Sequence, residues 1–267
     1  MASREPGRVS SPDPIGSQRS SSGPLGTEAE QSRSRLRLCS ALVACLAGFA
    51  LLTARVASHL GGLPVDRRVW RWVVEHRADM PIASFRMVSH IGDPLVLVVG
   101  AFISFLWLSR RRPLAVAVVP AAALLAAACT ETALKQIVGR SRPPAFARLV
   151  TETDPSFPSG HATGTAALLV AVALIAAPTF RSRTARVLSF AAAGAVALLV
   201  GVARVVLGVH WTSDVAAGWL LGAAWAVGAV LVVPAVEHRL SDRAATNRAD
   251  LVDGRRAAAR TSSAGAG

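Results

Sequence analysis

Lysine is almost absent from this chain of 267 residues. Lys135 is the only lysine among 29 lysine and arginine residues, so arginine supplies the bulk of the positive charge. The two side chains are not equivalent, because the ammonium group is a compact point charge and the guanidinium is a planar fork. We therefore expect position 135 to require a compact ammonium donor.

Cysteine is also scarce, and metal-ligand spacing is missing. Cys39, Cys45 and Cys129 lie inside apolar runs, without the spacing of a disulfide framework or of a metal site. The sequence likewise has no cluster of acidic residues arranged as metal ligands. We expect neither a structural disulfide nor a metal centre.

A motif for reading nucleic acid is missing, although the formal net charge is +13 and the sequence pI is about 11.6. The arginines are spread over loops and tails, and only 5% of the residues are aromatic, so base stacking has little support. Positive loops beside membrane spans explain the arginines better, and we expect no nucleic-acid partner.

Long apolar runs, in contrast, are abundant. The chain is 52% hydrophobic with a mean hydropathy of +0.44, and it contains stretches of roughly 15 to 23 apolar residues, about the length of a membrane-crossing helix. One soluble core does not accommodate five or six such runs. We predict an all-α integral membrane protein with a bundle of six transmembrane helices, near residues 38–59, 91–108, 114–134, 160–177, 187–206 and 213–234.

The two ends of the chain lack large apolar side chains and predict disordered tails over residues 1–32 and 241–267, the second of them basic. The membrane domain is expected over residues 38–236. Between the first two spans, residues 64–77 place apolar side chains on one helical face and arginines on the other. This short helix either lies in the membrane interface or packs on the soluble side of the protein. Its apolar face comprises Val69, Trp70, Val73 and Val74.

Arginine clusters predict the orientation. The clusters at residues 33–37, 110–112 and 181–186 fall on one side of a six-span bundle, together with the C-terminal tail. The positive-inside rule assigns that side to the cytoplasm. We therefore expect a multi-pass plasma membrane protein with both termini in the cytoplasm and with residues 135–160 and 207–213 on the extracytoplasmic face.

Ionisable residues gather at the predicted outer ends of the spans. Lys135 ends the third span, and Arg140, Arg142 and Arg148 follow in a proline-containing loop. For Arg140 and Arg148 we favour snorkelling or contact with lipid headgroups. Lys135 and Arg142 belong to a larger pattern, described next, and are candidates for phosphate binding.

The second part of the pattern is Pro158-Ser159-Gly160-His161, directly before the fourth span. Ser159 fits an N-cap, and the free amides of a helix start favour an anion. Gly160 would let the anion approach the backbone closely, and His161 could give a proton to a phosphate ester. Taken alone, the tetrapeptide equally fits an ordinary helix cap.

The third part is Arg204, at the end of the fifth span, followed by His210 and Asp214 at the start of the sixth. A spacing of four on a helix places His210 and Asp214 on one face, so that Asp214 could bond one imidazole nitrogen and leave the other as a nucleophile. An isolated pair of this kind also fits a structural cap, but an ionisable group at the edge of a span is a functional candidate.

The three parts together resemble the signature of the type 2 phosphatidic acid phosphatase superfamily, which includes bacterial lipid phosphate and diphosphate phosphatases, glucose-6-phosphatase and vanadium haloperoxidases. The resemblance covers about residues 60–235. One departure is Ala203, which stands where the family usually has a serine before the arginine, so a supporting hydrogen bond is lost.

The resemblance implies metal-independent hydrolysis of a lipid phosphate or diphosphate, such as phosphatidic acid, phosphatidylglycerol phosphate or a polyprenyl diphosphate. It implies that His210 forms a phosphohistidine while Asp214 orients it, and that His161 protonates the leaving oxygen and then activates water. No cofactor is implied, because cations stabilise the phosphate oxygens. The implied phosphate-binding groups are Lys135, Arg142, Ser159, Gly160 and Arg204.

Other readings of the same residues remain open. Vanadate-dependent halide oxidation uses the same kind of site, and a transporter or non-catalytic membrane protein could use some of the buried charges for an ion path. In the last span, Gly218 and Gly222 have small-xxx-small spacing, which predicts close helix packing within the chain or, alternatively, dimerisation. The sequence does not determine the oligomeric state.

Overall fold

The computed structural model describes residues 24–233, and no strand occurs in that range. The chain divides into an N-terminal unit, residues 1–36, and a main unit that begins at Arg37. Helix α1 (Pro24–Ala57) begins earlier than expected. It therefore overlaps residues 24–32 of the predicted disordered tail. Residues 1–23 and the predicted tail 241–267 lie outside the described residues.

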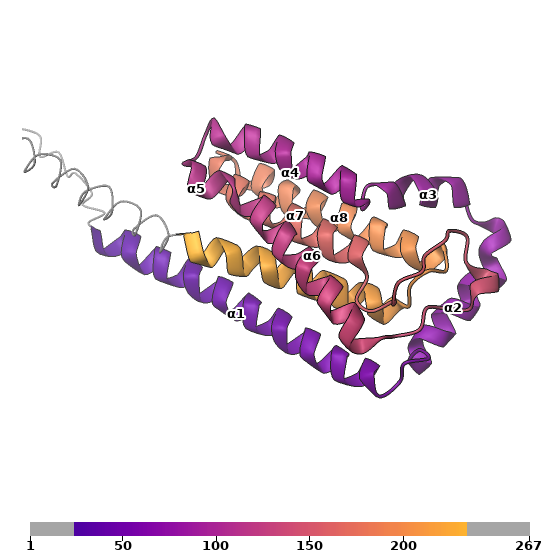
Figure 1. Cartoon of the computed structure of the whole chain (residues 1–267). Coiled ribbons are helices and arrows are strands. Elements are labelled where there is room, and N and C mark those ends of the chain that lie inside the picture. Colours follow the sequence, from indigo (N-terminus) through magenta and orange to yellow (C-terminus); the bar gives the residue numbers. More distant parts are fainter. Residues whose placement is uncertain (1–23, 234–267) are drawn as a thin grey trace, which may run out of the picture. The chain divides into compact units, whose positions relative to one another are not determined.

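The remaining helices confirm the all-α prediction (Figure 1). They are α2 (Pro64–His76), α3 (Ile82–His90), α4 (Pro94–Ser109), α5 (Leu114–Ala117), α6 (Val119–Val138), α7 (Gly160–Ala176), α8 (Arg183–Val206) and a last helix, Thr212–Val233. Short 3-10 turns lie at Arg77–Asp79, Ala145–Ala147 and Ala177–Thr179. Five helical segments are long and apolar enough to cross a membrane: 32–57, 114–138, 160–179, 183–206 and 212–233.

The second predicted span, near residues 91–108, differs from the structure because it forms as a bent pair of helices. α4 begins at Pro94, and it reaches spanning length only together with α3, from which it is bent by 51°. Proline suits the first turn of a new helix but cannot continue the previous one. At Gly92 the backbone also comes so close to α7 and α8 that a Cβ atom would lie 2.9 Å from His161 and 2.8 Å from Val200. The bend therefore brings the start of α4 against residues of the predicted site.

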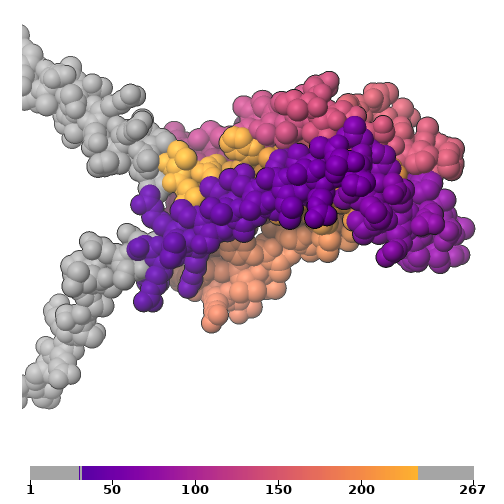
Figure 2. Space-filling view, turned by 90° about the horizontal axis from the view of Figure 1, so that it is seen from below, coloured from indigo at the N-terminus to yellow at the C-terminus, as the bar shows by residue number. Residues whose placement is uncertain are grey.

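Apolar side chains cover much of the outer surface of the main unit. On α1, Val43 is 65% exposed, and on α4, Leu95 is 74% exposed, with several neighbouring valines also exposed. Within the main unit, Figure 2 shows residues 37–57 of α1 on the outside of the bundle, with one side uncovered by other helices. A water-soluble protein rarely shows such continuous apolar surface, so these faces contact lipid. The chain is therefore a multi-span membrane protein.

α7 lies at the centre of the main unit and packs against α4, α6 and α8 (Figure 1). Small side chains allow this close packing: Ala162, Ala166 and Ala167 are almost completely buried. The last helix crosses α7 at Gly218 and Gly222, where an added Cβ would collide with backbone atoms of Ser159 and Thr163. Both glycines therefore serve packing within the chain.

α2 forms where an amphipathic helix was expected, and it packs on protein. Val73 is buried against Ala162, Val205 and Val215, while Trp72 on the other face is 54% exposed. Asp66 is buried in the first turn and accepts a hydrogen bond from the Leu63 amide at 2.9 Å. The structure thus favours the packing alternative over a helix lying free in the interface.

Candidate active site

Two distant segments of the chain meet at one end of the main unit. One runs from the end of α6 through the loop 139–159 to the start of α7, and the other is the turn between α8 and the last helix. Gly208 makes that turn with φ +74°, and a Cβ there would lie 2.6 Å from the Ala147 carbonyl oxygen, so both the conformation and the space favour glycine. The loop is joined to the turn by the Leu149 amide, which donates to the Leu207 carbonyl at 2.9 Å. All eight predicted site residues lie at this end.

His210 is buried and held from both sides of its ring. Its Nδ1 lies 2.9 Å from the carbonyl oxygen of Ser156, and its Nε2 lies 3.1 Å from Nη1 of Arg142. Because a carbonyl can only accept, Nδ1 carries the proton and Nε2 presents a lone pair. Burial lowers the pKa of His210 well below its ordinary value, and the charges of Arg142 and Arg204 lower it further. The ring is therefore neutral, which is the form that a nucleophile needs.

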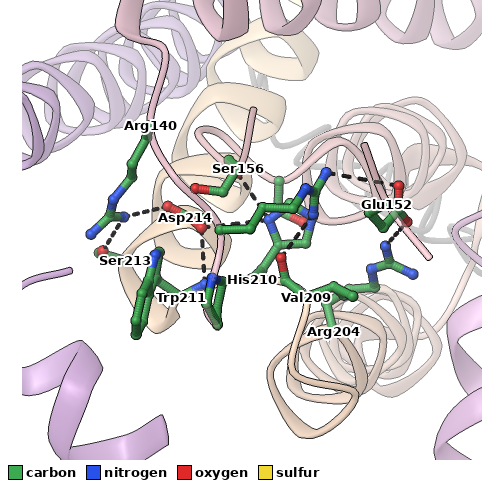
Figure 3. Close-up of polar contacts among 12 residues, drawn as sticks. Arg140, Glu152, Ser156, Arg204, Val209, His210, Trp211, Ser213 and Asp214 are labelled. Carbon is green, nitrogen blue, oxygen red and sulfur yellow. Dashed lines mark hydrogen bonds and ion pairs between the residues drawn. The ribbon is translucent and has the colours of Figure 1, made fainter. Parts of the chain in front are cut away.

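Asp214 is placed differently from the prediction (Figure 3). Its nearest approach to His210 Nδ1 is 3.5 Å, whereas the Trp211 amide donates to it at 2.9 Å and Arg140 forms an ion pair with its other oxygen. Ser156, whose carbonyl has no signature in the sequence, provides the direct hydrogen bond to the imidazole. Asp214 fixes the turn that carries His210. This is the structural role that the sequence left open for the pair.

Arg140 is completely buried, so the expectation that it snorkels or contacts headgroups is wrong. Its guanidinium forms ion pairs with Asp66 at 2.8 Å and with Asp214, and it donates to the Ser213 hydroxyl at 2.8 Å. A buried arginine needs such partners to offset its lost hydration. Arg148 is half-buried and donates to the Pro143 carbonyl at 2.8 Å.

The three predicted phosphate-binding cations converge, and each is paired with a carboxylate. Lys135 contacts Glu131 at 2.6 Å and also Asp154, and Arg142 contacts Asp154 at 2.7 Å. Arg204 pairs with Glu152 and donates to the Ser89 hydroxyl at 3.0 Å. The sequence analysis missed these acids. Only Glu131 had a readable signal, since it precedes Lys135 by one helical turn.

Asp154 shows how strongly the cations act. Burial opposes ionisation, but the hydrogen bond and the charge of Lys135, with those of Arg142, bring the pKa of Asp154 below its ordinary value. The carboxylate is thus ionised at neutral pH, and the interaction stabilises the fold above the ordinary pKa of an aspartate and is lost as the pH falls through the lowered one.

The start of α7 contains the remaining predicted residues. His161 Nε2 lies 2.9 Å from Asp93, which the sequence analysis did not select. Ser159 occupies the N-cap position without making a side-chain capping bond, and its buried hydroxyl has no partner among residues 24–233. Gly160 faces Glu131, whose carboxylate would lie 2.9 Å from an added Cβ. The anion near this helix start is therefore Glu131 of the protein itself.

Two cavities open beside the site. One of about 450 Å³ lies between α4, α6 and α7; its wall includes Leu97, Val98 and Leu124, and Lys135 and His161 lie at its polar end. The other, of about 290 Å³, has more charged residues in its wall, among them Arg86, Asp93 and Arg204. Glu152 and His161 line both cavities. Within the described part of the chain, no group of His, Cys, Asp and Glu is arranged to hold a metal ion.

Comparisons with known proteins agree on one kind of relative. Residues 116–237 match the PAP2 superfamily. The chain is 34% identical over 142 residues to phosphatidylglycerophosphatase B of Bacillus subtilis (strain 168); the match covers 51% of this chain and 66% of the relative, slightly less than two thirds of its length. The fold is similar to the crystal structure of a transmembrane PAP2-type phosphatidylglycerolphosphate phosphatase from Bacillus subtilis. The TM-score is 0.61 at 24% identity, and the alignment covers 74% of this chain and 96% of that one.

Proposed function

We propose that the chain is a member of the PAP2 superfamily, whose model matches residues 116–237, and that it is a membrane phosphatase that hydrolyses a lipid phosphate. The favoured substrate is phosphatidylglycerol phosphate, because of the similarity to phosphatidylglycerophosphatase B of Bacillus subtilis. The observation that carries the proposal is the 450 Å³ cavity, because its apolar wall leads to Lys135 and His161. A lipid would place its apolar part against α4 and α6 while its phosphate meets Lys135, which is one of the three predicted cations and lines this cavity.

In the first step, the Nε2 lone pair of His210 attacks phosphorus. A bond between Nε2 and phosphorus forms as the bond from phosphorus to the ester oxygen breaks, giving a phosphohistidine and a free lipid alcohol. The Ser156 carbonyl supports this step, because it holds the proton on Nδ1 and directs Nε2 toward the site. Asp214 and Arg140 hold the turn on which His210 lies.

His161 acts first as the general acid and then as the general base. Its imidazolium gives a proton to the leaving oxygen, and the neutral ring then takes a proton from the water that attacks the phosphohistidine. The carboxylate of Asp93, 2.9 Å from Nε2, orients the ring. The second step releases inorganic phosphate and restores neutral His210.

Cationic side chains stabilise the negative charge on the phosphate oxygens in the transition state. Lys135, Arg142 and Arg204 are all at most 9% exposed, so their interaction with the phosphate oxygens is weakly screened. The unpartnered hydroxyl of Ser159 is a further donor. We expect hydrolysis to continue in the presence of a chelator.

The test measures phosphate release by the purified protein in detergent with a chelator present. The substrates are phosphatidylglycerol phosphate, phosphatidic acid, undecaprenyl diphosphate and a soluble sugar phosphate. We expect the first to be hydrolysed fastest and His210→Ala to lose activity by roughly 1,000-fold or more, whereas His76→Ala, at an exposed position of α2, should retain it. Substantial release by folded His210→Ala, or dependence on added magnesium, would contradict the proposed mechanism.

A further inference from the structure

Residues 150–155, here called the acidic strap, cross the site without regular structure. The strap is anchored at both ends: the Leu149 amide donates to Leu207, and the Ser156 amide donates to Arg140, each at 2.9 Å. Between these anchors, no strap amide donates to another backbone group within the described range. The strap can therefore shift without breaking a backbone ladder.

The middle of the strap is held by the site cations. Glu152 pairs with Arg204, and Asp154 pairs with Lys135 and, at 2.7 Å, with Arg142. The backbone carbonyl of Asp154 accepts a further bond from Arg142 at 2.7 Å. The cations are buried, but the side chains of Glu152 and Asp154 are 25% and 41% exposed, so the carboxylates reach inward from the surface.

These carboxylates use the donors that a phosphate would need. Three carboxylates, Glu131, Glu152 and Asp154, are paired with three cations, Lys135, Arg142 and Arg204, so this cluster attracts a dianion poorly. Phosphate oxygens and carboxylate oxygens accept from the same guanidinium and ammonium groups. Phosphate therefore binds well only when the strap carboxylates leave. Glu131 lies on α6 itself and stays beside Lys135.

We propose that the acidic strap is a built-in competitor of the substrate: Glu152 and Asp154 occupy the phosphate-oxygen positions of the empty site, and the lipid phosphate displaces them when it binds. This inference rests on the proposed function, since it assumes that the cations bind phosphate.

Displacement of the acidic strap has a second effect. Glu152 lines both cavities, so its departure joins the apolar cavity to the one with more charged residues in its wall and lets water reach the phosphohistidine.

The first test removes the charges of the strap. Glu152→Gln and Asp154→Asn keep the side-chain shape but weaken the ion pairs. Binding of inorganic phosphate to the detergent-solubilised protein, measured by calorimetry, should tighten roughly fivefold or more in each variant. Glu75→Gln and Asp79→Asn remove the same charge at exposed positions and should leave the affinity unchanged. Unchanged or weaker binding in the strap variants, or no phosphate binding by any variant, would overturn the proposal.

Phosphate binding does not require turnover, so this test is separate from that of the proposed function. If the strap variants bind phosphate more tightly but the protein hydrolyses no lipid, the strap proposal stands and the proposed phosphatase activity is refuted. If the protein hydrolyses lipid but the strap variants gain no phosphate affinity, the phosphatase activity stands and the strap proposal is refuted.

The second test leaves both carboxylates intact, in case the variants do not fold. A spin label is placed at exposed Thr153 as Thr153→Cys, in a background in which Cys39, Cys45 and Cys129 are replaced by alanine. Saturating inorganic phosphate should increase the mobility of the label, because the strap leaves the cations. Unchanged or reduced mobility at saturation would rule out displacement.

Discussion

Lys135 shows what a single side chain contributes to this site. It is 9% exposed, and its ammonium group contacts two carboxylates, Glu131 on the same helix and Asp154 on the acidic strap. An ammonium can rotate its three donors toward partners in any direction, whereas a guanidinium donates within one plane. The crowded position therefore explains why lysine is used here when arginine is used everywhere else.

We predict that Lys135→Arg lowers kcat/KM for the lipid substrate by roughly 10- to 100-fold, although it keeps the charge. Phosphate release in detergent measures the effect. Arg148→Lys is the matched control, because Arg148 is half-buried and donates to the backbone carbonyl of Pro143. An unaltered rate in Lys135→Arg would show that the single lysine is incidental.

Among the structural elements, Arg140 joins three: the loop after α6, the start of α2 and the start of the last helix. Its partners Asp66 and Asp214 are both buried, and Asp66 also accepts from the Ser213 amide at 2.9 Å. The network thus fixes α2 against the turn that carries His210.

Arg140→Ala should destabilise the protein by about 3–5 kcal/mol, because it leaves two buried carboxyl groups without their cation. Thermal unfolding in detergent measures the loss, with Arg148→Ala as the control that should change stability much less. If Arg140→Ala unfolds at the wild-type temperature, the network does not support the fold.

Packing of the last helix on α7 gives an independent prediction. Gly222→Ala should cost about 1–3 kcal/mol, since its methyl group would meet the Thr163 carbonyl and the Ala167 amide. Gly194→Ala is the control, because nothing lies within 4 Å of its new methyl group and alanine favours a helix. Equal unfolding temperatures for the two variants would show that the crossing tolerates side chains.

The sequence predicts the spans and proposes eight site residues because both leave local signals: apolar length for the helices, and spaced motifs at helix ends for the proposed site. The pairing of Arg140 with Asp66 has no such signal, since the two residues are 74 positions apart and α2 meets the loop only in the folded protein. The strap was missed for a related reason. An acidic residue in an irregular loop is ordinarily solvated, and its contact with a cation depends on where the loop crosses the site.

For the whole molecule, the arrangement of the spans leads to a prediction about sidedness. All eight site residues lie at one end of the main unit, and Arg110 to Arg112 lie between α4 and α5, on the side that the positive-inside rule assigns to the cytoplasm. The site should therefore face the extracytoplasmic side.

The orientation is tested in intact cells with variants that each contain one introduced cysteine, in a background in which the native cysteines are replaced by alanine. A membrane-impermeant maleimide should label Thr153→Cys and should not label Arg111→Cys until the membrane is permeabilised; both positions are exposed. Labelling of Arg111→Cys alone would invert the proposed orientation.

The burial of Lys135 also determines how this protein reacts with amine reagents. Its ammonium is the only side-chain amine in the chain, and it lies at the polar end of the apolar cavity. A bulky water-soluble acylating reagent finds no accessible lysine on the surface. A small apolar electrophile that reacts with amines and enters from the bilayer would meet one side-chain amine, so a lysine adduct would mark the proposed catalytic centre.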